Sequence, residues 1–392
     1  MRHSDSVLPK DVRRPVPAAS ARPGRSATAV ALRPSRLRPC ARLLAVPLAL
    51  SLGLVLLPPA AQAVPAPAGP APAANALAAA RATAPRLVRI ATFNVRTARA
   101  TSDSRSWLQR APDVASEIRS RKTHVVLLQE LGPGRADGKA GTLNGNTRQT
   151  DSLTSTLKRQ GAGYYKLVRS TSYFVSGTKH GTQGARILYD SRIVKLVTRC
   201  SNTTGKRTYS TSCAFDLPIA AGESKELLRS AAYAEFADRR SGHRFFVVSA
   251  HLDSRHSKNN TTEARYNSIR AAQARAVADK LARVNPRNHP VVFGGDINSW
   301  RNDRGNFAPH RALTAKGYRE TATAKSRINY AYSTVNHFKT TMVASRSKAG
   351  GVRLDVVMAK GAKGVTRHEN RMARVDASRP SDHNMVLADV LL

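Results

Sequence analysis

The stretch Val291-Val-Phe-Gly-Gly-Asp-Ile-Asn-Ser299 decides the fold class, because it joins a short apolar run to two polar side chains. Residues 290–294 are too few for a helix and rich in β-branched and aromatic side chains, so they predict a buried strand. The glycine pair is expected to turn the chain sharply at the end of that strand. Asp296 and Asn298 are two positions apart and would share one face of an extended continuation. Taken alone, the stretch also fits an ordinary polar turn after a core strand.

The same pattern of a short strand with a polar residue at its end recurs along the chain. Strands predicted at 87–93, 124–129 and 245–250 are followed by Asn94, Glu130 and His251. Asp382 and His383 precede a last strand at 385–391, and Asp355 lies inside the apolar run 354–358. If these strands lie side by side, their ends form one cleft that holds carboxylates, amides and imidazoles.

The remaining periodicities predict an α/β domain. Helical spacing marks residues 107–121, 151–159, 262–284 and 309–316, and further strand patterns occur at 165–168, 185–189, 193–198 and 231–236. A polar, glycine-rich loop is predicted at 132–149. Helices that alternate with many strands, some joined as hairpins, predict two mixed sheets packed face to face with helices outside.

The N-terminal part of the chain predicts export. Within residues 1–63, a basic segment precedes the apolar run 43–57 and a small-residue end at Ala61-Gln-Ala63, which is typical of a secretory signal. An uncleaved anchor and a start downstream of Met1 remain alternatives. Residues 64–86 are rich in Ala and Pro and predict a disordered spacer, so the folded domain is expected at 87–392. We expect a secreted, extracellular monomer with no stable membrane association after cleavage.

The net charge indicates which partners the protein attracts, and the cysteines bear on its compartment. The chain has 64 Lys and Arg against 25 Asp and Glu, a net charge of +39. Residues 1–63 contribute ten basic and two acidic side chains, so the rest still carries +31. Such a surface attracts polyanions, which include nucleic acid, anionic lipid surfaces and polyphosphate, although some proteomes are basic throughout. Cys40 leaves with the signal, and Cys200 with Cys213 is expected to form a disulfide rather than a zinc site.

The predicted cleft has the side chains of a metal site. Several carboxylates at short range raise one another's pKa unless a cation neutralises them. The donors are oxygen-rich and no thiolate is available, which points to Mg²⁺ or Mn²⁺.

These residues, in their order along the chain, resemble the endonuclease/exonuclease/phosphatase superfamily. The resemblance rests on Asn94, Gln129-Glu130, His251-Leu252, Gly295-Asp-Ile-Asn298, Leu354-Asp355 and Ser381-Asp-His383. It covers about residues 88–392 and implies a four-layered α/β sandwich that hydrolyses phosphate esters with a divalent metal. It also implies that Glu130 is the principal metal ligand, with Asn94 and Asp382 completing the site directly or through water.

The resemblance implies roles for the other polar residues. Asp296 would orient or deprotonate the attacking water, and Asn298 would hold the phosphate. His383, oriented by Asp355, would stabilise the transition state or exchange a proton, and His251 would donate to the phosphate or to the leaving group. An Asp and an Asp-supported His both satisfy the requirement for a general base, so that assignment stays open.

Two positions fit the resemblance less closely. Arg229 matches by position a phosphate-binding arginine of the deoxyribonuclease branch, and a surface arginine is the competing interpretation. That branch also supports the histidine matching His251 with an acid, where this chain offers Gln183. The protonation role of His251 is therefore left open.

The leading hypothesis is a secreted, Mg²⁺-dependent nuclease that acts on DNA or RNA with little sequence preference. A sphingomyelinase-like enzyme would keep the site but needs an apolar or aromatic loop for membrane insertion, and the predicted loops are polar. A small-molecule phosphatase is a third possibility. A non-catalytic nucleic-acid-binding module is the alternative of another class, and the intact set of polar residues argues against it.

Overall fold

The computed structural model describes residues 86–99, 105–141, 143, 145–168, 184–200, 213–224, 227–300, 307–342, 352–372 and 376–392. All of them belong to one compact unit, Ala68–Leu392. The predicted signal, the predicted spacer apart from Arg86, and Gln183 lie outside the described residues.

Two mixed sheets form the centre of this unit. The first contains, in spatial order, β11 (Ser326–Ile328), β13 (Gly364–Arg371), β14 (Met385–Leu391), β1 (Leu87–Asn94), β2 (Val125–Gln129), β4 (Arg186–Asp190) and β3 (Tyr165–Leu167). The second contains β10 (Arg319–Glu320), β12 (Asp355–Lys360), β9 (Val291–Asp296), β8 (Arg244–His251), β7 (Arg229–Asp238) and β5 (Val194–Leu196), and β6 (Ala214–Leu217) also pairs with β7. Parallel pairs β1–β2 and β8–β9 lie at the middle of the two sheets.

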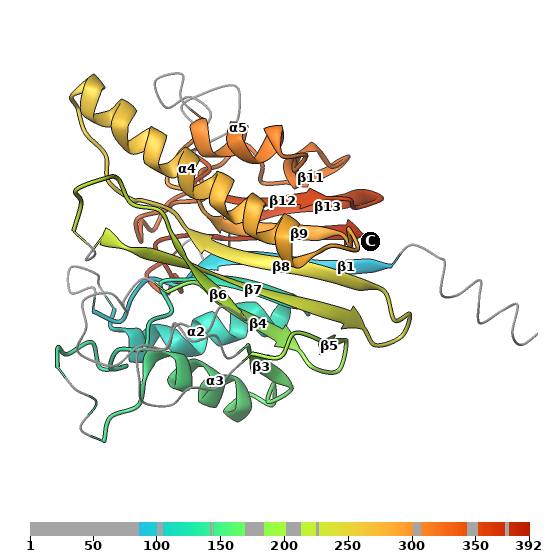
Figure 1. Cartoon of the computed structure of the whole chain (residues 1–392). Helices are drawn as coiled ribbons and strands as arrows, with labels where there is room; N and C mark the ends of the chain where they lie inside the picture. Colours follow the sequence, from blue (N-terminus) through green and yellow to red (C-terminus); the bar gives the residue numbers. More distant parts are fainter. Residues whose placement is uncertain are drawn as a thin grey trace, which may run out of the picture. The chain divides into compact units, whose positions relative to one another are not determined.

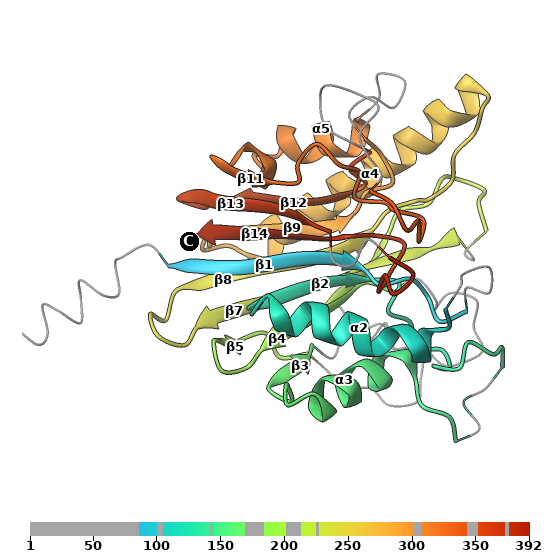
Figure 2. The same ribbon diagram turned by 180° about the vertical axis from the view of Figure 1, so that it is seen from behind.

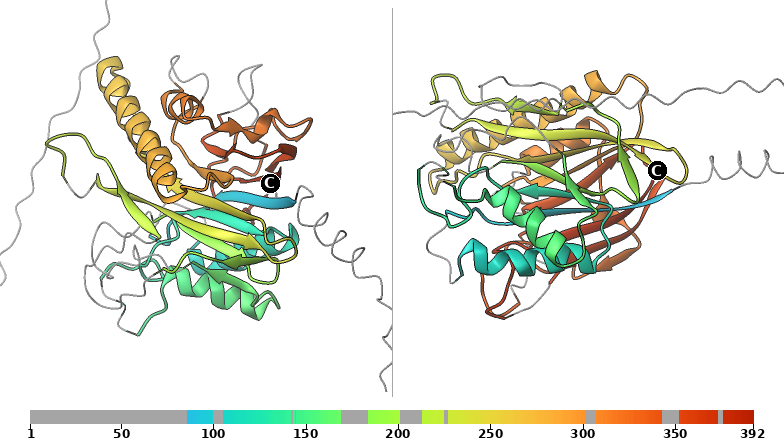
Figure 3. Two further views of the ribbon diagram at one scale, coloured as in Figure 1. Left: turned by 45° about the vertical axis from the view of Figure 1, so that its right-hand side comes forward. Right: turned by 90° about the horizontal axis from the view of Figure 1, so that it is seen from below.

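Helices cover the outer face of each sheet (Figures 1 and 2). Helices α2 (Trp107–Ser120) and α3 (Gln149–Arg159) pack on the first sheet through one apolar cluster. Helices α4 (Asn260–Val284) and α5 (Ala308–Ala315) pack on the second sheet through another, and Figure 3 shows the two helix pairs on opposite sides of the sheets. The predicted four-layered α/β sandwich is confirmed. No helix among the described residues has the length and apolar character needed to cross a bilayer.

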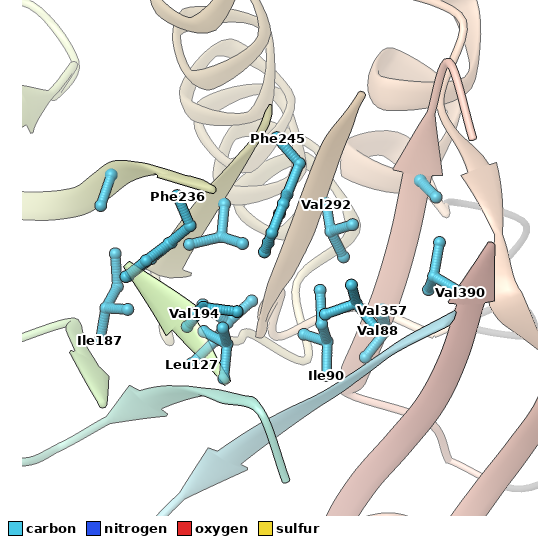
Figure 4. Close-up of a cluster of buried hydrophobic side chains, with 14 of the residues drawn as sticks. Val88, Ile90, Leu127, Ile187, Val194, Phe236, Phe245, Val292, Val357 and Val390 are labelled. Carbon is cyan, nitrogen blue, oxygen red and sulfur yellow. The ribbon is translucent and has the colours of Figure 1, made fainter. Parts of the chain in front are cut away.

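The inner faces of the two sheets form a shared core (Figure 4). Alternate residues of each strand point inward because side chains change sides at every position of a strand. Fully buried members from the first sheet include Val88, Ile90 and Leu127, and Phe245 and Val292 face them from the second. At the carboxyl ends of the strands the same inward face continues into polar residues, so the core leads directly to the predicted cleft.

The strand β9 differs from the prediction at its glycines. The strand continues through both of them to Asp296, and neither has a positive φ, so the sharp turn expected there was wrong. A Cβ on Gly294 would lie 2.5 Å from Leu127 Cδ1, and a Cβ on Gly295 would lie 2.4 Å from the carbonyl oxygen of Ala250. The glycines are needed because neighbouring groups occupy the space of a side chain. The turn occurs instead at Asn298, whose φ is 45°.

The predicted helices and most of the predicted strands are confirmed, with ends shifted by a few residues. The described residues of the predicted loop at 132–149 form no helix or strand before α3 begins at Gln149. An isolated bridge joins Arg135 to Arg148. The sequence patterns missed β6, β10, β11, β13 and the short 3-10 helix η3 (Thr321–Thr323). Their sequences are polar or very short, and their strands form by pairing with strands that were predicted.

The predicted disulfide is confirmed. Cys200 and Cys213 are bonded, with their Cα atoms 5.4 Å apart. Cys213 immediately precedes β6 and is buried in the shared core, and Cys200 follows β5. The bond therefore ties together two short strands that pair with different parts of β7.

We predict that Gly295→Ala lowers the free energy of unfolding by about 1–3 kcal/mol, because the new methyl group meets a backbone carbonyl that has no room to move. The matched control is Gly364→Ala in β13, where the added Cβ would lie 3.6 Å from Leu391 Cδ1, an ordinary contact. The control is expected to change stability by less than about 0.5 kcal/mol. Urea denaturation measures both, and equal midpoints for the two variants would contradict the packing argument.

Candidate active site

The carboxyl ends of the central parallel strands bring the predicted site residues together. The loop that leads from β8 to α4 marks this edge, at the left of Figure 1 and the right of Figure 2. Strand register pairs Asp296 with His251 on one side and with Asp355 on the other. Asn94 ends β1 and pairs in register with Gln129, the residue before Glu130. All of these residues except Glu130 are buried.

One carboxylate oxygen, Asp296 Oδ2, is the meeting point of the site. The side-chain amide of Asn94 donates to it at 3.1 Å. The Nε2 atoms of His251 and His383 lie 3.6 Å and 3.8 Å from the same oxygen. The other oxygen of Asp296 accepts a hydrogen bond from the backbone N–H of Asn298 at 3.0 Å. Two imidazoles and an amide therefore surround one carboxylate oxygen.

His383 and Asp355 form a buried pair. His383 Nδ1 lies 2.8 Å from Asp355 Oδ2, which leaves Nε2 directed towards Asp296. Burial opposes a charge on the ring, but the carboxylates of Asp355, Asp382 and Asp296 raise the pKa of His383 well above its usual range. These carboxylates therefore favour the protonated form of the ring.

The pKa values of Asp296 and His251 shift in opposite directions. Burial raises the pKa of Asp296 to about 7, and the nearby charge of Asp355 adds to this effect, while His383 opposes it. Burial, together with the positive charges of Arg229 and His383, holds the pKa of His251 well below its usual range. Asp296 is thus poised to exchange a proton near neutral pH, and His251 is a neutral ring.

The three predicted metal ligands lie beside this cluster. Glu130 has a φ of 57°, and its carboxylate accepts from the Asn94 amide at 3.1 Å and from the Thr97 N–H at 2.9 Å. The Asp382 carboxylate pairs with Arg96 Nη1 at 2.7 Å. Ser381 Oγ donates to the backbone carbonyl of Asn94 at 2.7 Å, which holds the loop of Asp382 against the end of β1.

These ligands fit a hard divalent cation. The donors are carboxylate and amide oxygens, and the cysteines of the described residues are bonded to each other. The guanidinium on Asp382 shows that this carboxylate takes a cationic partner at its position in the fold. The donor atoms of Asp296, Asp355 and His383 also lie within 4.8 Å of one another, and this buried group is a second set of residues that could hold a metal ion. Glu130, Asn94 and Asp382 remain the predicted set.

Asn298 and Arg229 complete the predicted site. Asn298 is buried, and its side-chain amide donates to the backbone carbonyl of Leu252 at 3.1 Å. Arg229 Nη2 donates to Ser254 Oγ at 2.8 Å, and its buried Nη1 has no hydrogen-bond partner among the described residues. Burial lowers the pKa of Arg229, and the carboxylates of Asp253, Asp296 and Glu130 oppose this effect, so the guanidinium lies within range of the charges of the cluster.

The group that supports His251 is not found among the described residues. Nδ1 of His251 is buried and has no hydrogen-bond partner within the part of the chain that the structure describes. Gln183, which stands at the expected position, lies outside that part. The structure therefore brings the predicted residues to one edge, and their catalytic roles stay predictions.

Two arginines near the site were missed by the sequence patterns. Arg96 follows β1 and pairs with Asp382, as described above. Arg110 of α2 is buried and donates to four backbone carbonyls, at 3.3 Å to Arg105, 2.8 Å to Val95, 3.3 Å to Arg96 and 3.0 Å to Pro380. It joins the loop after Asn94 to the loop before Asp382. The only signal in the sequence is an arginine on the mostly apolar buried face of a helix.

Comparison with known proteins shows the family to which this chain belongs. The family model described as "Endonuclease/Exonuclease/phosphatase family" matches residues 91–383. The chain belongs to this family. Its members are generally hydrolases of phosphoric esters that depend on a divalent metal. No curated protein matches the sequence.

Solved structures show the same fold at low sequence identity. An endonuclease/exonuclease/phosphatase family protein from Bacteroides thetaiotaomicron has a TM-score of 0.55 and 18% identity over 79% of this chain and 98% of that chain. A mannosyl-6-phosphatase from the same organism has a TM-score of 0.55 and 19% identity, covering 78% and 100%. The human Nocturnin catalytic domain with a bound sulfate anion has a TM-score of 0.50 and 15% identity, covering 78% and 95%.

The raised pKa of Asp296 predicts a pH-dependent cost in stability. Between the ordinary value of 3.8 and about 7 the folded chain holds a proton that the unfolded chain has released. Stability contributed by this group is therefore lost as the pH rises through that window. Asp296→Asn is expected to raise the melting temperature in EDTA more at about pH 8 than at about pH 5.

Asp151→Asn is the control for this measurement, since the Asp151 side chain is 55% exposed. It is expected to shift the melting temperature equally at both pH values. A gain from Asp296→Asn that does not change with pH would contradict the assignment.

Proposed function

We propose that the protein is a secreted, Mg²⁺-dependent phosphodiesterase that hydrolyses DNA or RNA with little sequence preference. The observation that carries this proposal is the convergence of His251, His383 and Asn94 on Asp296 Oδ2, next to the carboxylates of Glu130 and Asp382. A carboxylate that titrates near neutral pH, flanked by a cationic and a neutral imidazole, suits the attack of water on a phosphate ester.

Each side chain has a separate role in this proposal. Glu130, Asn94 and Asp382 would hold the metal ion, which would supply charge neutralisation at the phosphate and a lowered pKa for water. Asp296 takes the proton from the attacking water, because its pKa lies near 7. His383 stays protonated beside Asp355 and stabilises the negative charge that develops on phosphate oxygens. This arrangement favours Asp296 over His383 as the general base.

Three further residues bind the substrate in this proposal. His251 is neutral, so it donates a hydrogen bond to a phosphate oxygen or to the leaving group without adding charge. Asn298 is held in place by Asp296 and Leu252 and binds the phosphate. The buried Nη1 of Arg229 has no hydrogen-bond partner among the described residues and would donate to the same phosphate.

A nucleic acid is the favoured substrate because of charge. The chain beyond the predicted signal carries +31, and a polyanion binds such a surface through many phosphate contacts. Lipid phosphodiesters are disfavoured, because the large exposed hydrophobic residues in the described ranges are single and lie on separate segments: Leu108, Leu227 and Met342. A phosphomonoesterase is the second candidate, and the fold shared with a mannosyl-6-phosphatase supports it.

The proposal of export is supported by the disulfide between Cys200 and Cys213, since such bonds persist in oxidising compartments. We predict that protein recovered from the culture medium begins at Val64, the residue after Ala63. Intact-mass spectrometry and N-terminal sequencing measure the start. Retention of residues 1–63 in a cell-bound protein would support the uncleaved anchor.

We predict that the purified protein nicks supercoiled plasmid with Mg²⁺ and does not nick it in EDTA. His383→Ala is expected to lower the nicking rate by about 10²–10⁴-fold, because it removes the cation that faces the phosphate. The control is His243→Ala, at the opposite end of the β8 region, which is expected to keep wild-type activity. Hydrolysis of sugar phosphates without any nicking would favour the phosphomonoesterase.

A further inference from the structure

An aromatic pair lies on the two loops that carry the site. Strands β8 and β9 are parallel, and their register pairs His251 with Asp296. The segments that follow both strands therefore leave the sheet at the same edge. His256 lies five residues beyond His251, and Trp300 lies four beyond Asp296. Their rings meet with centroids 5.7 Å apart and planes inclined by 50°.

The histidine of this pair is held in place by a buried carboxylate. His256 Nδ1 lies 3.2 Å from Glu263 Oε1. Glu263 is itself anchored by the buried Arg270 at 2.6 Å and by the N–H of Ser257 at 2.7 Å. The side chain of His256 remains 38% exposed. The ring is therefore fixed in orientation while part of its surface faces solvent.

The tryptophan differs from the structural tryptophan of the same chain. Trp107 is 1% exposed, and its indole N–H donates to Ser152 Oγ at 2.7 Å inside the α2–α3 layer. Trp300 is only half-buried, and its ring lies against the ring of His256. A large aromatic ring that is left partly open, two residues from Asn298, has surface available to a ligand.

Hydrogen bonds link the segments that carry the pair to Asn298 and Arg229. Asn298, two residues before Trp300, donates to the carbonyl of Leu252 at 3.1 Å. Arg229 reaches Ser254, two residues before His256, at 2.8 Å. A ligand whose phosphate lies between Asn298 and Arg229 would therefore have its neighbouring group next to the two rings.

We propose that Trp300 and His256 form a stacking subsite for one nucleobase adjacent to the phosphate that is cleaved, an inference that rests on the proposed nuclease function. Bases inside a duplex already stack on their neighbours, so this ring surface is available only to an unpaired base. Single-stranded or locally unpaired nucleic acid is then the preferred substrate. Every base has a flat π-face, so the subsite adds affinity with little sequence preference.

The test uses the full protein and a single-stranded oligonucleotide in which one base at a time is replaced by an abasic tetrahydrofuran. Wild type is expected to lose about 10-fold or more in kcat/KM when the base at one position beside the cleaved bond is missing. Trp300→Ala is expected to lose about the same factor on the intact strand and nothing further on that abasic strand. Trp300→Phe, which keeps a ring, is expected to restore most of the loss.

Tyr164→Ala is the matched control. Tyr164 is also a half-buried aromatic residue, with the Arg192 guanidinium 3.2 Å from its ring centroid, but it precedes β3 and lies near Asp190, at the other end of the first sheet. This variant is expected to behave as wild type on both strands. Thermal unfolding establishes that all variants are folded.

The outcomes separate the two proposals. If wild type cleaves intact and abasic strands equally, or if Trp300→Ala keeps the wild-type preference for the intact strand, the stacking subsite is wrong and the nuclease function stands. If wild type cleaves neither strand but hydrolyses a phosphomonoester, the nuclease function fails and the subsite fails with it.

Discussion

The close contact of the two sheets at β9 is the constraint on which the rest of the structure depends. At Gly294 the strand lies so near the opposite sheet that an added Cβ would be 2.5 Å from Leu127 Cδ1 and 3.1 Å from Thr92 Cβ. This contact sets how far apart the central strands of the two sheets are directly behind the site. Because Asp296 is two residues further along the same face, its position relative to Asn94 of the opposite sheet follows from the same contact.

The alternation of strand side chains explains why the chemistry lies at the edge of a hydrophobic core. The inward face of each central strand is apolar along its length and polar at its end, so the site is continuous with the core and largely closed to water. Burial makes ionisation of Asp296 costly and raises its pKa to about 7. The same low-dielectric surroundings strengthen the pairing of His383 with Asp355. The burial that raises the pKa of Asp296 therefore costs stability when this group ionises. The well-packed sheets on either side hold the site residues in place.

Loops carry several of the reactive groups, and buried polar residues hold those loops in place. Arg110 joins the segments after Asn94 and before Asp382 through backbone carbonyls. On the other side, Asn384 donates to the Ser333 carbonyl and accepts from Asn336, which steadies the residue next to His383. Each of these polar groups is buried and hydrogen-bonded, as is required for buried polar groups that do not destabilise the fold. The geometry of the site therefore depends on side chains that do not touch a substrate themselves.

Local patterns in the sequence determined the helices, the main strands and the types of residue at the strand ends. Period-2 and period-3.6 hydrophobicity is a property of neighbouring residues, so it predicts β1, β9 and α4 without knowledge of the fold. It could not predict β13, whose buried His368, Glu369 and Asn370 are polar and are stabilised by partners far away in the chain, such as Thr321 and Arg121. The pairing of Arg96 with Asp382 and the meeting of His256 with Trp300 also required the tertiary structure. The physical reason is that strand register and loop packing bring these residues together, and both depend on contacts between segments that are distant in sequence.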